Sequence, residues 1–559
     1  MSRGGRWALV ALVAMFSLAA AYGMRADLPF SRFATEEEQV FYAVKFGSGD
    51  LNPHYFLHPP FFAYGLCGLY GVSFVVGRVL GYVHSVADFE RLFFTDPTVF
   101  FLIARIAVLG LGALGLLLFY RLSLRLYKQE LVALLAVGFL AVSPQHVIAA
   151  HYANTDIPVM VVAFLALMAI TRVLQTGAMS SYLMAGGLIG LATATKYNAA
   201  WLGVALLMAH VIRTVSAKAP WRAVVCSPRL LAGMGVIVVG FIMGCPYALL
   251  DFPTFISSYR KLTWELMTPE YHFASYRVQG LSYLFLIKEV FARSLGVPLM
   301  VVSAIGLCYA LWRQQPEDLL LSGFFLTFAA YVGSWDIIKP RYFIFTFPLA
   351  LLLAARWCVA LVDRLPRASI RTAILAGVWA ILSIAPVRGI VQFNRLVAQT
   401  PAPVRARVWI EQHVPPGTGV AAFAGVPLIP NEVSIQRQLE EIHTKRLGQG
   451  IRLQRLLRYV NSLPATYDVW PLPFPWREDF DEADFNFEQH GQAGVKYFLV
   501  TQEIEHYLAD PTRYPKQVAY YEAIMRACQL VQVFRQPSPM VDTGLGAEEY
   551  VLIYEFRTG

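Results

Sequence analysis

The sequence predicts a polytopic α-helical membrane domain followed by a smaller soluble α/β domain. The first sign is composition, since 57% of the 559 residues are apolar and the mean hydropathy is +0.51. The second is that apolar runs long enough to span a bilayer recur between residues 7 and about 391. Beyond that point proline, charge and short alternating segments dominate. We therefore expect a transmembrane domain over residues 1–395 and a soluble domain over residues 396–559.

Charge and cysteine content disfavour two classes of protein. The net charge is +9, but lysine and arginine are dispersed among the loops, so we expect no nucleic-acid partner. Five of the six cysteines lie in or beside apolar segments and Cys528 stands alone, which gives neither a disulfide framework nor a zinc pattern. The sequence also has no Walker loop, HExxH or GxSxG motif, and no G-x-G-x-x-G stands at a strand–helix junction, which argues against soluble nucleotide chemistry.

The first apolar run, residues 7–23, resembles a signal peptide, with cleavage conceivable near Ala21. We favour an uncleaved helix, because many more spans follow and the acidic loop behind it needs an anchor. The positive-inside rule then orders the later spans by placing the cationic connections in the cytoplasm. The result is about eleven spans, namely the first run and those near residues 99–120, 131–150, 157–174, 182–195, 198–213, 230–249, 296–312, 319–335, 342–360 and 372–391.

This order requires the run 182–213 to be a hairpin of two short helices that turns at residues 195–198. One long tilted helix is the alternative. It would cross the membrane once instead of twice, so the number of crossings between two cationic connections would no longer be even. The stretch 59–80 opens with two prolines and is rich in aromatics and glycine, so we expect a helix lying in the interface plane. The outer face then carries the loops 25–98 and 250–295, the turns 151–156 and 336–341, Lys196 and the soluble domain.

The soluble domain alternates helices and strands, which predicts a small α/β layer. The expected helices are residues 402–413, 436–461 (interrupted at the glycines 448 and 450) and 515–527, and the expected strands are 419–425, 495–501, 530–534 and 549–556. Between residues 465 and 487 lies an aromatic, proline-rich loop. Its rings could stack on sugar or lipid, or anchor the domain at the interface, and both readings stay open.

Acidic residues are placed where a general base would be needed. Glu36, Glu37 and Glu38 are consecutive at the start of the first outer loop, where acids also suit a helix N-terminus. A second acid, Asp156, begins a span after the second outer turn. Two outward acids at this depth match a general base and an orienting carboxylate.

Basic residues on the same side indicate an anionic ligand. Lys196 lies among apolar residues at the mouth of the predicted hairpin, and Lys339 and Arg341 flank Pro340. Snorkelling or ordinary juxtamembrane charge would also explain them. Cations retained on the outer side run against the usual distribution and suit a lipid phosphate. His54 and His58 precede the two prolines, and a structural role competes with a functional one there.

Several of these segments together resemble the GT-C superfamily of integral-membrane glycosyltransferases, which includes the protein O-mannosyltransferases, the aminoarabinose transferase of lipid A and the Rgt-type enzymes. The similar segments are TEEE, GDLNPHYFLHPPFFAY, NTDIP, GLATATKYNAAWL and KPRYFIFTFPLALLLAA, with ARVWIEQHVPPGTGV opening the outer domain. They cover most of residues 30–355 and follow one another in the family's order.

The resemblance implies that a sugar moves from a polyprenyl-phosphate-linked donor to a protein, lipid or glycan acceptor at the outer face of a cell membrane. A bacterial inner membrane fits, with the C-terminal domain periplasmic or extracellular and membrane lipids as further partners. Glu36 or Glu37 takes the place of the family's catalytic acid, and Asp156 matches its second acid. The implied substrate-binding residues are Lys196, Tyr197, Lys339, Arg341, His54 and His58.

This sequence departs from the family pattern in two places. The usual Asp-Glu is replaced by three glutamates, so Glu38 also stays in play as the base, and His58 stands where a lysine is common. Some relatives use a divalent cation, and Glu36, Glu37 and Asp156 could supply oxygen ligands to Mg²⁺ or Mn²⁺, although nothing in the sequence requires one. A transporter or flippase of a lipid-linked or anionic substrate is the alternative function, but such proteins tend to show internal repeats and charge at the midplane.

Overall fold

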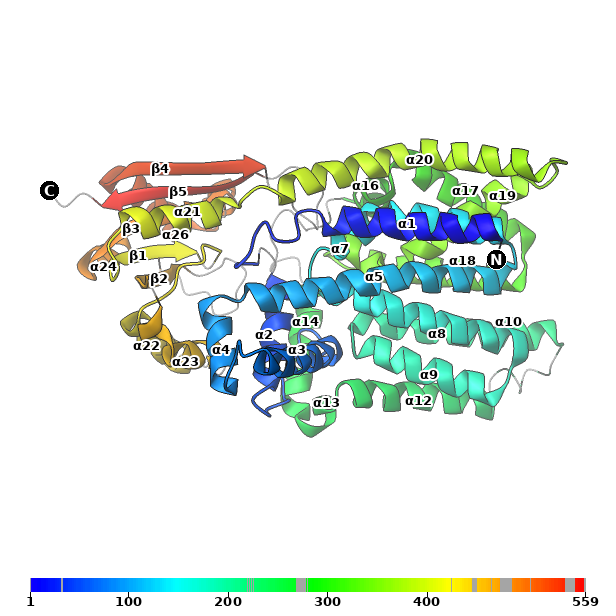
Figure 1. Ribbon diagram of the computed structural model, residues 1–559, viewed down its shortest axis with the longest axis horizontal. Coiled ribbons are helices and arrows are strands. Elements are labelled where there is room, and N and C mark those ends of the chain that lie inside the picture. Colours follow the sequence, from blue (N-terminus) through cyan, green and yellow to red (C-terminus); the bar gives the residue numbers. More distant parts are fainter. Residues whose placement is uncertain are drawn as a thin grey trace.

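The computed structural model describes residues 2–31, 34–218, 220, 222, 224, 226–267, 278, 280–423, 425–444, 450–463, 465–472, 485–502, 504–537 and 548–556. Long helices run side by side along the long axis of the molecule, and a small sheet with its helices lies beyond one end of them (Figure 1). This end also carries the helices of the loop 25–98 (Figure 1). The fold therefore has the two parts that the composition predicts.

The helices of the bundle bury one continuous apolar core. They are α1 (Arg3–Ala21), α5 (Thr98–Tyr127), α6 (Glu130–Ala141), α7 (Pro144–Ala149), α8 (Asp156–Thr176), α9 (Met179–Thr193), α10 (Leu202–Ser216), α12 (Pro228–Gly244), α17 (Val297–Arg313), α18 (Pro316–Gly333), α19 (Phe347–Val362) and α20 (Ala368–Val397). The predicted span 131–150 is broken into α6 and α7, because Pro144 cannot donate the hydrogen bond that would continue α6. Helix α1 belongs to this bundle, with Phe16 and Ala20 fully buried.

The predicted count of about eleven spans is not confirmed. Six described helices are long and apolar enough to cross a membrane, or seven if the bent pair Ser282–Leu295 and Val297–Arg313 forms one span. Four further apolar helices have only 10–17 residues, namely α6, α9, α12 and α19. The chain is therefore a polytopic membrane protein whose shorter helices leave the number of crossings open.

The predicted helical hairpin over residues 182–213 is confirmed. Helix α9 ends at Thr193, a single 3₁₀ turn follows, and α10 begins at Leu202. Arg213 near the end of α10 donates to the carbonyl oxygens of Leu174 at 3.1 Å and Gln175 at 2.9 Å, just before α9 begins. Because the end of α10 returns to the start of α9, residues 194–201 form the turn, and Lys196 lies at this turn.

Helices of the outer loops lie across the bundle. Helices α2 (Ala34–Phe46), α3 (Phe61–Val79) and α4 (Val86–Thr95) gather at the sheet end of the long helices (Figure 1). Both α1 and α3 have 19 residues, yet α3 is strongly foreshortened in the same view, so it runs in a different direction. Helix α3 meets the length and composition of a span, but this orientation suits the interfacial helix that the sequence predicts. The predicted loop 250–295 contains helices α13 (Tyr247–Leu250) and α14 (Phe252–Met267).

The soluble domain is a five-stranded mixed sheet in the order β2-β1-β3-β5-β4. Strands β1 (Gly419–Phe423), β3 (Val495–Thr501), β4 (Cys528–Pro537) and β5 (Glu548–Phe556) confirm the four predicted strands. Strand β2 (Asp468–Leu472) was not predicted and lies in the aromatic segment 465–487, of which residues 473–484 are outside the described residues. Proline weakens a strand signal, but β2 is an edge strand, where Pro471 is tolerated.

The helices of this domain agree with the sequence in place and kind. Helices α21 (Ala402–His413) and α26 (Pro515–Ala527) have the predicted bounds. The predicted helix 436–461 is two helices, α22 (Glu432–Thr444) and α23 (Ile451–Leu457), and Gly450 adopts a positive φ of 58° before the second one. Two short helices, α24 (Phe487–Gln492) and α25 (Ile504–Ala509), complete the layer.

Helix α9 of the hairpin packs closely against α12, and the contact depends on a glycine. A Cβ added to Gly190 of α9 would lie 2.3 Å from the carbonyl oxygen of Ile237 and 2.5 Å from the backbone nitrogen of Phe241. At Gly187 the nearest atom would be 3.8 Å away, an ordinary contact. Small residues allow this close approach of two apolar helices, and it fixes where α9 ends and the turn containing Lys196 begins.

We expect Gly190→Ala to destabilise the protein by about 1–3 kcal/mol, because the methyl group meets backbone atoms that cannot move independently. The measurement is the thermal unfolding midpoint of the detergent-solubilised protein. Gly187→Ala is the matched control on the same helix and should leave the midpoint nearly unchanged. Equal midpoints for the two variants would contradict this packing.

Candidate functional site

Helix α2 sends its three adjacent glutamates into three different environments. Successive residues of an α-helix point about 100° apart, so the side chains cannot share one face. In the structure Glu36 is fully buried, Glu37 is 38% exposed and Glu38 is 22% exposed. The three acids therefore need separate explanations.

Glu36 holds α2 to the bundle. Its carboxylate accepts hydrogen bonds from Arg105 of α5, from Nε at 2.8 Å and from Nη2 at 2.7 Å. It also accepts from the backbone N–H of Ala153 at 2.8 Å and from the hydroxyl of Ser31 at 2.5 Å. Both oxygens are thus engaged by donors inside the protein. Glu36 therefore anchors α2 to the helix bundle, and its buried carboxylate cannot reach a substrate.

Arg105 is the centre of this anchor. It is 1% exposed and also donates from Nη1 and Nη2 to Asp27, at 2.8 and 3.2 Å, and from Nη1 to the carbonyl oxygen of Met24 at 2.5 Å. The ring of Tyr152 lies 5.3 Å from the guanidinium carbon. An arginine inside an apolar span is costly unless it is paired. That cost was the signal in the sequence that could have pointed to Arg105 and to an acidic partner.

Glu37 faces the soluble domain. It pairs with Arg452 of α23 at the surface. One turn further along α23, Arg455 donates to Glu90 of α4 at 2.9 Å and to the Ser48 hydroxyl at 2.8 Å. These contacts dock α23 on the first outer loop. Glu37 therefore lies at a contact between the two parts of the molecule.

Glu38 lies beside His58, where the loop returns. Its Oε2 is 2.9 Å from Nδ1 of His58. Its Oε1 is buried and accepts no hydrogen bond of ordinary geometry within the described parts of the chain. Tyr42 lies one turn along α2, and burial together with the charge of Glu38 holds the pKa of Tyr42 well above its usual value. Tyr42 therefore stays protonated beside a negative charge.

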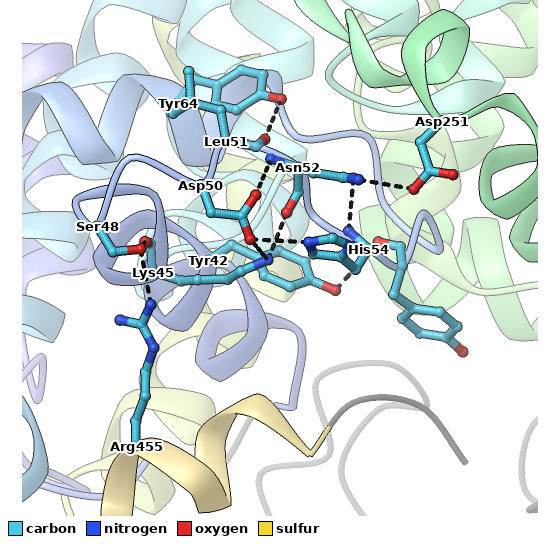
Figure 2. A network of polar contacts seen from close by, with 11 residues as sticks. Tyr42, Lys45, Ser48, Asp50, Leu51, Asn52, His54, Tyr64, Asp251 and Arg455 are labelled. Carbon is cyan, nitrogen blue, oxygen red and sulfur yellow. Dashed lines mark hydrogen bonds and ion pairs between the residues drawn. The ribbon is translucent and has the colours of Figure 1, made fainter. Parts of the chain in front are cut away.

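The loop between α2 and α3 is held in shape by its own polar network, shown in Figure 2. Lys45 is 1% exposed and lies 3.3 Å from Asp50, and it donates to the carbonyl oxygen of Asn52 at 2.6 Å. Nε2 of His54 is 2.9 Å from Asp50, and the Asn52 amide donates to Asp251 at 2.8 Å. His54 therefore has a structural role in this loop. The Asn52–Asp251 hydrogen bond connects the loop to the segment between α13 and α14.

Asp156 and Lys196 form the other charged pair of the site. Asp156 is the first residue of α8 and is 3% exposed, and Lys196 donates to its Oδ1. The Lys196 ammonium also lies 5.6 Å from the centroid of the Tyr342 ring. Asn198 donates to the Tyr342 carbonyl oxygen at 3.2 Å. These contacts place the segment 339–342 against the Lys196 turn, with Lys339 and Arg341 flanking Pro340 in that segment.

The separate loops meet at one place. Ala153, three residues before Asp156, donates to Glu36. The segment that carries His58 is fixed at both ends to the Lys196 turn, because the Tyr197 hydroxyl donates to the Phe56 carbonyl oxygen at 2.9 Å and the Phe61 N–H to the Ala194 carbonyl oxygen at 3.2 Å. Acids from two loops and a cation from a third therefore lie together, as the sequence predicts.

The acids do not fit a divalent metal site. Glu36 is paired with Arg105, Glu37 with Arg452 and Asp156 with Lys196. Over the described residues, no group of three or more histidine, cysteine, aspartate or glutamate side chains could hold a metal ion. A cation would have to displace an internal positive charge at each acid. The geometry thus gives no support to the Mg²⁺ or Mn²⁺ hypothesis for Glu36, Glu37 and Asp156.

Comparison with known proteins indicates the fold. The family of dolichyl-phosphate-mannose-protein mannosyltransferases (PMT_2) matches residues 94–242. The search of curated proteins returned no match. Among solved structures, ArnT from Cupriavidus metallidurans bound to undecaprenyl phosphate is 15% identical, with 99% of this chain and 98% of that chain covered and a TM-score of 0.49.

An archaeal oligosaccharyltransferase is similar over a comparable part of the chain. The apo form from Archaeoglobus fulgidus is 12% identical, with 92% of this chain and 71% of that chain covered and a TM-score of 0.50. The form tethered to an acceptor peptide is 13% identical, with 96% of this chain and 74% of that chain covered and a TM-score of 0.50. The resemblance to GT-C membrane glycosyltransferases is therefore confirmed at the level of the fold.

The anchoring role of Glu36 predicts that replacing Glu36 destabilises the protein much more than replacing the neighbouring Glu37. We expect Glu36→Gln to destabilise the protein by about 3–5 kcal/mol, because it leaves a buried arginine short of a charge partner. Glu37→Gln removes a surface ion pair and should cost no more than about 1 kcal/mol. The measurement is the thermal midpoint together with the yield of monodisperse protein. Similar losses for the two variants would contradict the anchoring role of Glu36.

The loop network predicts a pH dependence that belongs to Asp50. Burial alone would raise the pKa of this carboxyl, but hydrogen bonds from His54 and the Asn52 N–H, with the charge of Lys45, bring the pKa below its usual value. The carboxylate therefore stabilises the loop above the ordinary pKa of about 3.9, and the effect is lost as the pH falls through the folded-state pKa.

Wild type should accordingly unfold at a higher temperature than Asp50→Asn at pH 7, with the difference closing below about pH 4. The measurement is the thermal midpoint of each protein from pH 7 to 3. Asp510→Asn, in the soluble domain, is the control for general acid effects. A difference that stays constant down to pH 3 would show that Asp50 does not act through its charge.

Proposed function

We propose that the protein transfers a sugar from a polyprenyl-phosphate-linked donor to a nucleophilic acceptor at the outer face of the membrane. The observation that carries this proposal is the meeting of Asp156, Lys196 and the α2 acids at one end of a GT-C-type helix bundle. The match to a family that uses dolichyl phosphate mannose supports a lipid-linked donor. Such a donor enters from the bilayer, which explains why the chain needs no nucleotide-binding motif.

The proposal also includes a membrane topology. The shorter helices α6, α9, α12 and α19 also cross the bilayer, and with α18 they bring the total to about eleven spans. The cationic connections then face the cytoplasm, and α2, the Lys196 turn, the segment 339–342 and the soluble domain face outward. Tilt and local thinning accommodate helices of this length. A bacterial inner membrane with a periplasmic active site suits this arrangement.

Each charged group of the site then has a task. Lys196, assisted by Arg341 and Lys339, binds the lipid phosphate and offsets the charge that grows on it as the sugar leaves. Asp156 holds the ammonium of Lys196 in place. Tyr197, tied to the Phe56 carbonyl oxygen, fixes the loop beside this pair. In this arrangement Asp156 is a positioning residue, and the proton from the acceptor goes elsewhere.

A transporter or flippase, the alternative that the sequence leaves open, is favoured by no observation among the described residues. The charges at the outer ends of the helices suit transfer at a surface better than passage through the midplane. Mass spectrometry of the lipid that copurifies with the protein would identify the chain length and head group of the donor directly.

We expect Lys196→Met and Asp156→Asn to lower the rate of transfer from a radiolabelled polyprenyl-phosphate-sugar by about 10²–10³-fold, the usual effect of removing a charge-stabilising group. The folded fraction of each variant is checked by its thermal midpoint. Lys496→Met, an exposed lysine of the soluble domain, is the control and should keep wild-type activity. Undiminished transfer by both site variants would overturn the proposal.

A further inference from the structure

One pair of titratable side chains at the site has no part in the anchor, the interdomain contact or the Lys196 pair. It consists of Glu38 and His58, which meet through Oε2 and Nδ1 at 2.9 Å. The remaining oxygen of Glu38 is buried without a hydrogen bond of ordinary geometry in the described chain. The Tyr42 hydroxyl interacts with this carboxylate, but a buried carboxylate oxygen without a well-formed hydrogen bond is costly, and such a cost is retained most often at a functional site.

The segment that carries His58 is bonded to the turn that contains Lys196. The backbone on either side of His58 is bonded to the Lys196 turn, at Phe56 and at Phe61. Glu38 contacts His58 of this segment, Tyr197 is bonded to the Phe56 carbonyl oxygen of the same segment, and Tyr197 directly follows Lys196. The carboxylate, the imidazole and the proposed phosphate-binding cation therefore lie within one small region. His58 is also 25% exposed, so the outer atoms of its ring can meet a substrate.

On the basis of the proposed function, we infer that His58 is the general base that activates the acceptor, oriented by Glu38. With Nδ1 directed to the carboxylate, the proton-accepting atom of the ring is Nε2. A carboxylate behind an imidazole fixes the tautomer and offsets the positive charge that the ring acquires. Glu38 is the positioning residue and His58 the catalytic residue of this pair.

The step balances without a further reactant. Nε2 of His58 takes the proton of the acceptor hydroxyl while the acceptor oxygen bonds to the anomeric carbon of the donor. The bond between that carbon and the phosphate oxygen breaks, and its electron pair leaves with the lipid phosphate. Lys196 stabilises the phosphate, and Glu38 stabilises the imidazolium that forms.

The other acids near the site are less suited to this task. Glu36 is buried with both oxygens engaged, and Asp156 is 3% exposed and paired with Lys196. Glu37 faces Arg452 at the surface. Among the described residues, the titratable groups near the pair include Tyr42 and Tyr55 of the first loop and Tyr197 of the hairpin turn.

The test compares three replacements at position 58 and one at Glu38 by transfer rate against pH. We expect His58→Gln and His58→Lys to lower kcat by about 10²–10⁴-fold and to abolish the acid limb that imidazole protonation gives the wild-type profile. Glu38→Gln should lower kcat while the KM for the donor stays near that of wild type. In His58→Ala, added imidazole should restore part of the rate, which a purely structural role would not allow.

Two results would overturn the inference. A His58→Lys enzyme with near-wild-type kcat would show that position 58 supplies a positive charge to the phosphate and takes no proton. A His58→Gln enzyme within about threefold of wild type, with its acid limb intact, would exclude His58 as the base.

The controls separate this inference from the proposed function. His84→Gln, on the exposed loop before α4, should leave the rate profile unchanged. Binding of the polyprenyl phosphate alone, measured by thermal shift, should persist in His58→Gln. If the wild-type protein transfers no sugar, the proposed function fails, whereas transfer that ignores position 58 sinks the assignment of the base alone.

Discussion

The buried guanidinium of Arg105 is the constraint on which the end of the helix bundle nearest the sheet depends. A charge 1% exposed inside a helix bundle must be neutralised and fully hydrogen-bonded. The donors of Arg105 reach Asp27 and the Met24 carbonyl oxygen before α2 and Glu36 within it. One side chain of α5 thereby fixes the connection after α1, the rotation of α2 and, through Ala153, the turn before α8.

Fixing the rotation of α2 decides what its neighbours can do. With Glu36 turned inward, the 100° step of the helix sends Glu37 to the surface and Glu38 to the side on which the loop returns. The loop network around Lys45 and Asp50 then carries the chain back so that His58 meets Glu38. Three identical residues acquire three different surroundings because one of them is committed to a buried arginine.

Sequence reasoning was sufficient for the features that depend on composition and periodicity. The two-part architecture, the hairpin that turns near Lys196 and four of the five strands followed from apolar length, charge parity and alternation. The meeting of the loops that carry Glu36, Asp156 and Lys196 at one end of the bundle also followed, because the predicted parity of the crossings puts these loops on one side. Strand β2 was missed since Asp468 and Pro471 weaken its pattern, and only pairing with β1 makes it a strand.

The sequence could not separate the three glutamates, because identity and spacing are the same for each and only a partner distinguishes them. That partner, Arg105, is 69 residues away from Glu36, and no local pattern relates the two. The same limit applies to metal binding: acids that look available in the sequence are each matched to a distant cation in the fold.

Pairing of the acids with internal cations also bears on how such a site handles an anionic donor. Under the proposed function, the lysine receives a phosphate in a low-dielectric region, where an unpaired positive charge is costly to hold. In the structure Asp156 holds the Lys196 ammonium in place, and the ring of Tyr342 lies 5.6 Å from the same ammonium. Under the proposed function, an ammonium that is already oriented needs little reorganisation when the phosphate departs, which is the condition under which a fixed charge contributes most to catalysis.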